Sequence, residues 1–198
     1  MVQKADPADS FIIARLHHQA IQEGFLSKLG VGVLTLLYAY LIEKELVLVY
    51  KKNLRVTGFI SCALNTRGMA KRFLVSKPGA ILKVLWVLMM HPKMIYPLYE
   101  SIQAIHQSRY SFKENIPLPA TELLSITVDP HIQQANIGTQ LLLSLELHLR
   151  NSGITSYKVV AGASLVGANK FYVKNGFRLA TQITIHGEKP SNIYIRDL

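Results

Sequence analysis

The stretch ELLSITVDPHIQQANIGTQLLL, residues 122–143, joins a strand pattern to a helix pattern through a short polar loop. Residues 121–128 read as a strand that ends before Pro130, and a helix is predicted from about Asn136 to Arg150. The first amide groups of a helix have no intrahelical acceptor and carry the positive end of the helix dipole. The junction therefore favours an anion such as a pyrophosphate. Taken alone this signal is weak, because every strand–loop–helix junction has free amide groups.

Helix and strand patterns alternate on both sides of this unit. Before it, the sequence predicts strands over about 2–5, 46–50 and 55–64, a hairpin turn over 51–53, and helices over 10–22 and 31–44. After it, the sequence predicts strands over 157–161, 177–185 and 191–196, with a short helix over 167–175. Strands that alternate with helices, with hairpins at both ends, predict an α/β domain around a mixed sheet.

The segment from about 67 to 115 interrupts this alternation. It holds apolar helical patches that are broken near Pro78 and Pro92. The part from Ile81 to Met90 is apolar almost all round, with Lys83 as its one charge, and such a helix is normally buried or pressed against another apolar phase. We expect a helical insertion that either packs into the core or a dimer interface, or lies on an anionic membrane.

The composition excludes several classes of protein. The chain has 198 residues, of which 49% are hydrophobic and 17% charged, so it is not mainly disordered. Its single cysteine, Cys62, excludes a disulfide scaffold, and its scattered histidines suggest no metal site. The longest mainly apolar stretch, residues 29–42, is shorter than the roughly 18–20 residues that span a bilayer. No signal peptide is predicted, and a cytoplasmic location is the expectation.

The net charge of +10 is concentrated in one part of the sequence. No Asp or Glu occurs between Glu45 and Glu100, whereas nine Lys and Arg residues do. A field of one sign favours an anionic partner, such as a phosphorylated ligand, an acidic membrane or nucleic acid, and the alternative is a solvated basic face. Nucleic acid is disfavoured, because the aromatic residues of this stretch are not interleaved with the cations as a stacking platform requires.

Two motifs suggest a family. The first is the loop Gln133-x-x-Asn136-x-Gly138, and the second is ANKFYVKNGF, residues 168–177. At this separation they resemble the acetyl-CoA loop and the second signature of the GCN5-related N-acetyltransferase (GNAT) superfamily. The resemblance covers the chain apart from about 67–115. It implies a single domain over residues 1–198 with a mixed, mostly antiparallel sheet flanked by helices, and places the insertion between the third and fourth strands.

Two positions depart from the pattern of that family. Asn136 replaces the first glycine of the loop, and Asn is the residue other than Gly that most readily adopts a left-handed backbone. Leu165 stands where many members have an Asn that contacts the cofactor, so that contact is expected to be lost. Both changes bear on the affinity for acetyl-CoA rather than on the fold.

The resemblance implies an acetyl-CoA-dependent N-acetyltransferase in which a primary amine attacks the thioester directly. The acceptor would be an amino sugar or another small or carrier-bound amine. The alternative is a catalytically degenerate GNAT fold that binds an acyl-CoA or a partner without turnover. No metal is implied, and the choice between a monomer and a homodimer stays open.

By the same resemblance, roles follow for particular residues. Tyr172 is the expected general acid, because a hydroxyl with a pKa near 10 can polarise or protonate a leaving thiolate. Glu122 is the candidate base that takes the proton of the amine. The structural alternatives are a half-buried core tyrosine and a strand-edge carboxylate in a salt bridge. The expected cofactor-binding residues are Ile126, Thr127, Val128, Gln133, Gln134, Ala135, Asn136, Ile137, Gly138, Thr139, Asn169 and Tyr172.

Overall fold

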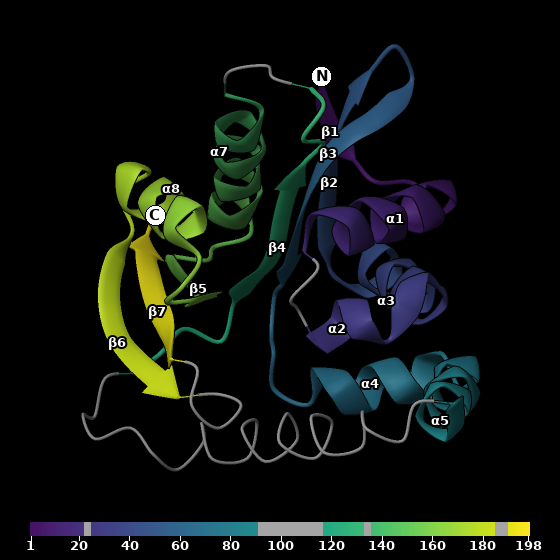
Figure 1. The fold of residues 1–198 in the computed structure, drawn as a ribbon. Coiled ribbons are helices and arrows are strands. Elements are labelled where there is room, and N and C mark those ends of the chain that lie inside the picture. The colour runs from purple at the N-terminus through teal and green to yellow at the C-terminus, as the bar shows by residue number, and fades with distance from the viewer. Residues whose placement is uncertain (22–24, 91–116, 133–135, 185–189) are drawn as a thin grey trace.

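The computed structural model describes residues 1–21, 25–90, 117–132, 136–184 and 190–198. Seven strands form one sheet in the order β1-β2-β3-β4-β5-β7-β6 (Figure 1). Their bounds are β1 Val2–Lys4, β2 Leu46–Lys52, β3 Arg55–Ala63, β4 Glu122–Val128, β5 Ser156–Gly162, β6 Arg178–Thr184 and β7 Pro190–Asp197. Within this sheet only β4 and β5 pair in parallel, so the predicted mixed, mostly antiparallel sheet is confirmed.

Helices cover both faces of the sheet (Figure 1). A short 3-10 turn, Pro7–Asp9, precedes α1. The described helices are α1 Ser10–Ala20, α2 Phe25–Lys28, α3 Gly30–Lys44, α4 Met69–Ser76, α5 Gly79–Met90, α7 Ile137–Asn151 and α8 Val166–Lys174. The helices α1 and α3 bury one face of the sheet and α7 buries the opposite face.

The central strands are apolar on both faces because both faces are covered. In β2, Leu48 packs with α7, whereas Val47 and Val49 pack with α1 and α3. The same holds for β3, where Ile60 faces α7 and Phe59 faces the other layer. This explains why these strands read as nearly continuous apolar runs instead of alternating with polar residues.

The first hairpin differs from its prediction. The turn was expected at Lys51, Lys52 and Asn53, but Lys51 and Lys52 belong to β2, and Lys52 pairs with Arg55. The turn is formed by Asn53 and Leu54, which both have positive φ, at 49° and 64°. A two-residue hairpin requires such a left-handed pair to match the twist of its strands, and Asn accepts it readily.

Between β3 and β4, the structure describes the two helices α4 and α5, where the helical insertion was predicted. They are separated at Lys77 and Pro78, as expected for a break at proline. Residues 91–116 lie outside the described part. The alternative in which the apolar helix is buried in the core is wrong for the described residues, because only Ala80 of α5 is fully buried. The single-domain organisation stays a prediction.

Candidate active site

The parallel strands β4 and β5 are paired over only two residues. Glu122 lies opposite Lys158 and Leu123 lies opposite Val159, and the described ladder ends there although both strands continue. The other edge of β4 stays paired with β3 along its length. Beyond Leu123 the two strands therefore form a fork, and β4 presents unpaired backbone groups toward β5.

A β-bulge marks the position at which the strands separate. Ser61 pairs with Ser125 and Cys62 pairs with Leu123, so Leu124 is an extra residue in β4. A bulge bends its strand and increases the local twist. Because this bulge follows the last pair between β4 and β5 directly, it turns β4 away from β5 and opens the fork.

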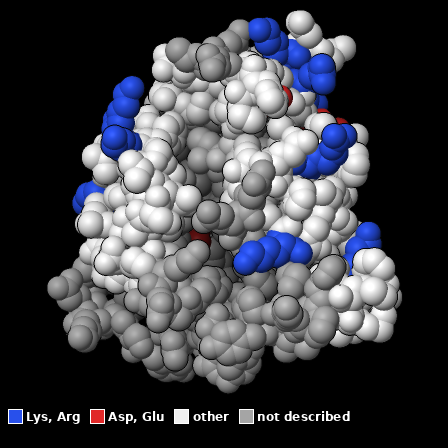
Figure 2. Space-filling view, in the orientation of Figure 1, with Lys and Arg blue, Asp and Glu red and all other residues white. Residues whose placement is uncertain are grey.

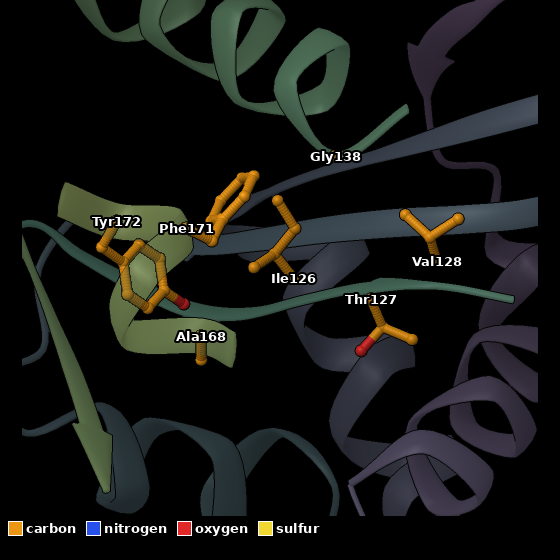
Figure 3. A pocket seen from close by; sticks show the side chains of 7 residues that line it. All are labelled: Ile126, Thr127, Val128, Gly138, Ala168, Phe171 and Tyr172. Carbon is orange, nitrogen blue, oxygen red and sulfur yellow. The ribbon is translucent and has the colours of Figure 1, made fainter. Parts of the chain in front are cut away.

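A cavity of about 210 Å³ lies in this region, where β4 meets the first turn of α7 and the helix α8 (Figure 3). Five of its seven lining residues are predicted site residues, and the other two come from the second motif. The cavity is lined by Ile126, Thr127, Val128, Gly138, Ala168, Phe171 and Tyr172. The fold thus brings β4 and both motifs to one place, although they are separated in the sequence.

The helix α7 begins at Asn136 in the way its sequence predicts. Asn136 has φ 81° and ψ 7°, which is the left-handed conformation that was expected of this departure from glycine. The first backbone bond of the helix runs from Gln140 N–H to the Asn136 carbonyl, at 2.8 Å. The amide groups of Ile137, Gly138 and Thr139 precede that bond, so they have no acceptor within the helix.

Gly138 allows a close approach between the two motifs. A Cβ atom at this position would lie 3.3 Å from Cε2 of Phe171. A side chain at position 138 would therefore press on the Phe171 ring, which would have to shift by a few tenths of an ångström. The predicted loop residues Gln133, Gln134 and Ala135 lie outside the described part of the chain.

Tyr172 is buried, with 5% of its surface exposed, among the rings of Phe171, Phe177 and Tyr194. Its hydroxyl points from α8 toward β4 (Figure 3). Burial raises the pKa of Tyr172 to about 12. The phenol is therefore protonated at neutral pH and can donate a hydrogen bond into the cavity.

The side chain of Asn169 is held by several protein groups. Its Nδ2 donates to the carbonyls of Gly162 at 2.9 Å and Leu165 at 2.7 Å. Its Oδ1 accepts from Asn192 Nδ2 and from the Tyr194 hydroxyl, both at 2.9 Å. Asn169 thus ties α8 to β5 and β7. Leu165, the second departure from the family pattern, is 45% exposed just before α8.

Glu122 lies at the closed end of the fork. Its Oε2 is 3.2 Å from Lys158 Nζ, which also donates to the Pro119 carbonyl at 2.6 Å. Glu122 is absent from the described lining of the cavity. The arrangement includes the salt bridge that was the structural alternative for this residue, and a role as base would require a water between Glu122 and the amine.

A buried polar cluster lies against the other face of β4. His17 Nδ1 is 2.6 Å from the Tyr38 hydroxyl, which also bonds the hydroxyls of Ser61 and Ser125. Burial, with a smaller effect from the nearby His18, lowers the pKa of His17 to about 4, so its ring is neutral. Burial raises the pKa of Tyr38. No sequence pattern predicts this cluster, because its members come from four separate elements without a shared motif.

Comparison with solved structures shows that this is the fold of the acetyltransferases. One acetyltransferase is 21% identical, with a TM-score of 0.61 over 100% of this chain and 98% of that chain. The Salmonella typhimurium protein yncA, solved with acetyl-CoA, is 14% identical, with a TM-score of 0.61 over 100% and 92%. The paia N-acetyltransferase of Thermoplasma acidophilum, in complex with coenzyme A, is 14% identical, with a TM-score of 0.60 over 100% and 98%.

A comparison of the sequence with family models gives independent evidence about the family. The sequence model of the Acetyltransferase (GNAT) family matches residues 97–177, which include β4, α7, β5 and α8. No curated protein sequence matches the chain. The match over residues 97–177 and the shared fold confirm the resemblance to the GNAT acetyltransferase family that the two motifs predicted. The expected enzyme class, an acetyltransferase, and the expected co-substrate, acetyl-CoA, are confirmed at the level of that family.

Proposed function

We propose that this chain transfers an acetyl group from acetyl-CoA to a primary amine by direct attack of the amine on the thioester. The observation that carries the proposal is the fork between β4 and β5. Its cavity touches the unpaired edge of β4, the first turn of α7 and the buried phenol of Tyr172. A thioester with an extended arm and a pyrophosphate needs these three features together.

The cofactor is held mainly by backbone groups. An extended pantetheine arm pairs with the free edge of β4 at Ile126, Thr127 and Val128, as an added strand does. The pyrophosphate accepts hydrogen bonds from the start of α7, where the helix dipole favours negative charge. The residues that supply these amide groups are Gln133, Gln134, Ala135, Asn136, Ile137, Gly138 and Thr139. Asn169 contributes by fixing the start of α8 through its bonds to Gly162 and Leu165.

In the reaction, the amine nitrogen forms a bond to the thioester carbon while the bond from that carbon to sulfur breaks. An amide N–H at the edge of β4, near Ile126, stabilises the oxyanion that develops on the carbonyl oxygen. Tyr172 donates its hydroxyl hydrogen to the leaving sulfur. Because its pKa is about 12 and that of a thiol is about 8.5, complete proton transfer is uphill, so Tyr172 acts mainly as a hydrogen-bond donor.

The amine must lose a proton during the reaction. We assign its removal to Glu122, acting through water, because a carboxylate at the closed end of the fork is close to the end of the thioester path. Its partner Lys158, with Nζ 3.2 Å from Oε2, holds the carboxylate at this end of the fork. The acceptor is an amino sugar or another small or carrier-bound amine, and the net charge of +10 favours one that also carries an anionic group. The chain acts as a monomer or a homodimer in the cytoplasm.

Release of free CoA from acetyl-CoA tests the proposal. The acceptors to compare are amino sugars, their phosphorylated and nucleotide-linked forms, polyamines and peptides with free N-termini. We expect release of CoA that depends on one of these amines, and binding of CoA measurable by calorimetry. CoA that binds without release with any amine would support the degenerate alternative. No binding of CoA at all would overturn the cofactor site itself.

A further inference from the structure

The helix α5 exposes a face made entirely of large apolar side chains. At about 100° per residue, positions i, i+1, i+4, i+5, i+8 and i+9 fall within roughly half of the circumference of a helix. The six side chains at these positions are all exposed: Ile81 at 42%, Leu82 at 71%, Leu85 at 57%, Trp86 at 60%, Met89 at 67% and Met90 at 52%.

The opposite face of α5 holds it against the protein. Ala80 is fully buried, Val84, Val87 and Leu88 are partly buried, and the helix packs on α3. The exposed face is therefore the outer surface of an anchored helix, and no described residue covers it. Large contiguous apolar patches are rare on the surface of soluble monomeric proteins and usually mark an interaction site, so we expect this face to bind a partner.

Cations lie close to the apolar face in the sequence. In the sequence, Lys71, Arg72, Lys77 and Lys83 lie on or next to α4 and α5, and no Asp or Glu occurs from residue 46 to residue 99. Arg72 pairs with Glu45 and Lys77 with Glu43. Figure 2 shows the lobe of α5 at the lower right as white, with a Lys or Arg side chain at its margin.

The length of α5 decides how it would meet a bilayer. Its 12 residues span about 18 Å, which is less than the roughly 30 Å of a hydrocarbon core. No single helix in the described part of the chain is long and apolar enough to cross a membrane. The helices α4 and α5 together reach that length and composition, but they meet at a bend of 100°. A helix of this kind lies in the plane of the interface, with its apolar face inward and its cations at the head groups.

We propose that the exposed face of α5, together with the cations of α4 and α5, docks on the surface of a bilayer that contains anionic lipids. A second copy of this chain is the other apolar partner to consider. A symmetric dimer through α5 would bring two copies of the same basic segment together, which is electrostatically unfavourable. An anionic bilayer satisfies the apolar face and the cations at once. The inference does not depend on the proposed acetyl transfer.

Trp86 provides a direct probe, because it is the only tryptophan in the chain and lies on the exposed face. The protein is mixed with vesicles of phosphatidylcholine, with or without phosphatidylglycerol, at low and moderate salt. We expect a blue shift of the emission and co-flotation with the anionic vesicles, weakened by salt. Unchanged emission, with the protein remaining in the soluble fraction for both compositions, would overturn the proposal.

Matched variants separate the apolar contribution from the electrostatic one. Leu85→Glu should abolish co-flotation, whereas Leu147→Glu on α7, at nearly the same exposure of 58%, should not. Replacing Lys71 and Lys83 with Gln should weaken binding to anionic vesicles about thirtyfold, since each cation near such a surface contributes about 1 kcal/mol. The exposed pair Lys4 and Lys52, changed in the same way, serves as control.

Two further measurements keep the interpretation unambiguous. The circular dichroism spectrum and the urea midpoint of Leu85→Glu should equal those of the unaltered chain, which shows that a loss of flotation is not a loss of folding. Sedimentation without lipid should give the same mass for both proteins. If instead the unaltered chain is a dimer that Leu85→Glu converts to a monomer, and neither binds vesicles, then the face is an interface between copies and the membrane proposal is wrong.

Discussion

Tyr172 lies in surroundings that keep its phenol neutral. Its ring packs against Phe177 and Tyr194, and burial holds its pKa near 12. An enzyme with this residue as hydrogen-bond donor should therefore lose no activity through ionisation of the phenol below about pH 11. The packing and the chemistry of Tyr172 can be separated by removing only the oxygen.

The variant Tyr172→Phe keeps the ring contacts and removes the hydroxyl. We expect kcat to fall about 100-fold, because the leaving sulfur loses its hydrogen-bond donor, while the affinity for CoA changes little. Steady-state kinetics and calorimetry give the two quantities. Tyr40→Phe is the matched control, since Tyr40 is a buried tyrosine of α3 outside the cavity lining. Wild-type turnover in Tyr172→Phe would remove this residue from the mechanism.

His17 should make the stability of the protein depend on pH. Its pKa is about 4 in the folded protein and 6.5 in the unfolded chain, so protonation favours unfolding. The stability that the neutral ring contributes is complete above pH 6.5 and is lost as the pH falls toward 4. This corresponds to at most about 3 kcal/mol.

Urea denaturation between pH 4 and pH 8 measures this effect. In His17→Gln the amide oxygen can still accept from the Tyr38 hydroxyl but does not titrate, so the loss of unfolding free energy at low pH should be smaller. His131→Gln changes an exposed histidine and should keep the wild-type dependence. Equal dependence on pH in His17→Gln and the unaltered chain would contradict the assignment.

At the scale of elements, the start of α7 combines a steric and an electrostatic requirement at Gly138. A methyl group there would approach the Phe171 ring at 3.3 Å, so Gly138→Ala should weaken CoA binding moderately as the ring shifts. Gly138→Asp adds a negative charge beside the proposed pyrophosphate site, and CoA affinity should fall at least about 100-fold. A carboxylate in the first turn of a helix does not disfavour the helix, so circular dichroism should be unchanged.

Calorimetry with CoA distinguishes the two contributions, because only the aspartate variant introduces repulsion. Raising the salt concentration should recover part of the affinity of Gly138→Asp and none of that of Gly138→Ala. Unchanged affinity in Gly138→Asp would show that the cofactor lies elsewhere.

The elements themselves were largely predictable because their signals are local. The strand before Asp129, the left-handed Asn136 and the left-handed Gly176 after α8 follow from side-chain pattern and backbone preference. The bulge at Leu124 was not predictable, because it is defined by pairing with Ser61 and Cys62, which are distant in the sequence.

The packing partner of the apolar helix α5 was the second feature that the sequence could not predict. An apolar sequence indicates that α5 needs apolar contact, but it does not indicate which neighbour supplies it. The hydrogen bond between His17 and Tyr38 joins α1 to α3 and is likewise a product of packing. The two sequence motifs therefore predicted which residues form the site, whereas the fork and the buried cluster were visible only in the structure.

At the scale of the whole molecule, one buried carboxylate connects the two sides of the fork. Glu146, on α7, is 5% exposed and accepts from the Tyr157 hydroxyl of β5 at 2.9 Å and from Arg196 Nε of β7 at 3.1 Å. Arg196 also donates to the carbonyl of Gly176, directly after α8. The side of the fork that carries α7 is thereby held to the side that carries α8.

Removal of this carboxylate should destabilise the whole fold. In Glu146→Ala the Tyr157 hydroxyl and the Arg196 guanidinium lose their buried acceptor, and the free energy of unfolding should fall by about 3 kcal/mol or more. Glu43→Ala is the matched control, because Glu43 pairs with Lys44 and Lys77 at the surface, where ion pairs contribute little, so its effect should be much smaller. Urea denaturation at low and high salt measures both. Salt should abolish the small effect of Glu43→Ala but leave that of Glu146→Ala, since buried pairs are poorly screened. Similar losses in the two variants would mean that Glu146 does not hold the two sides of the fork together.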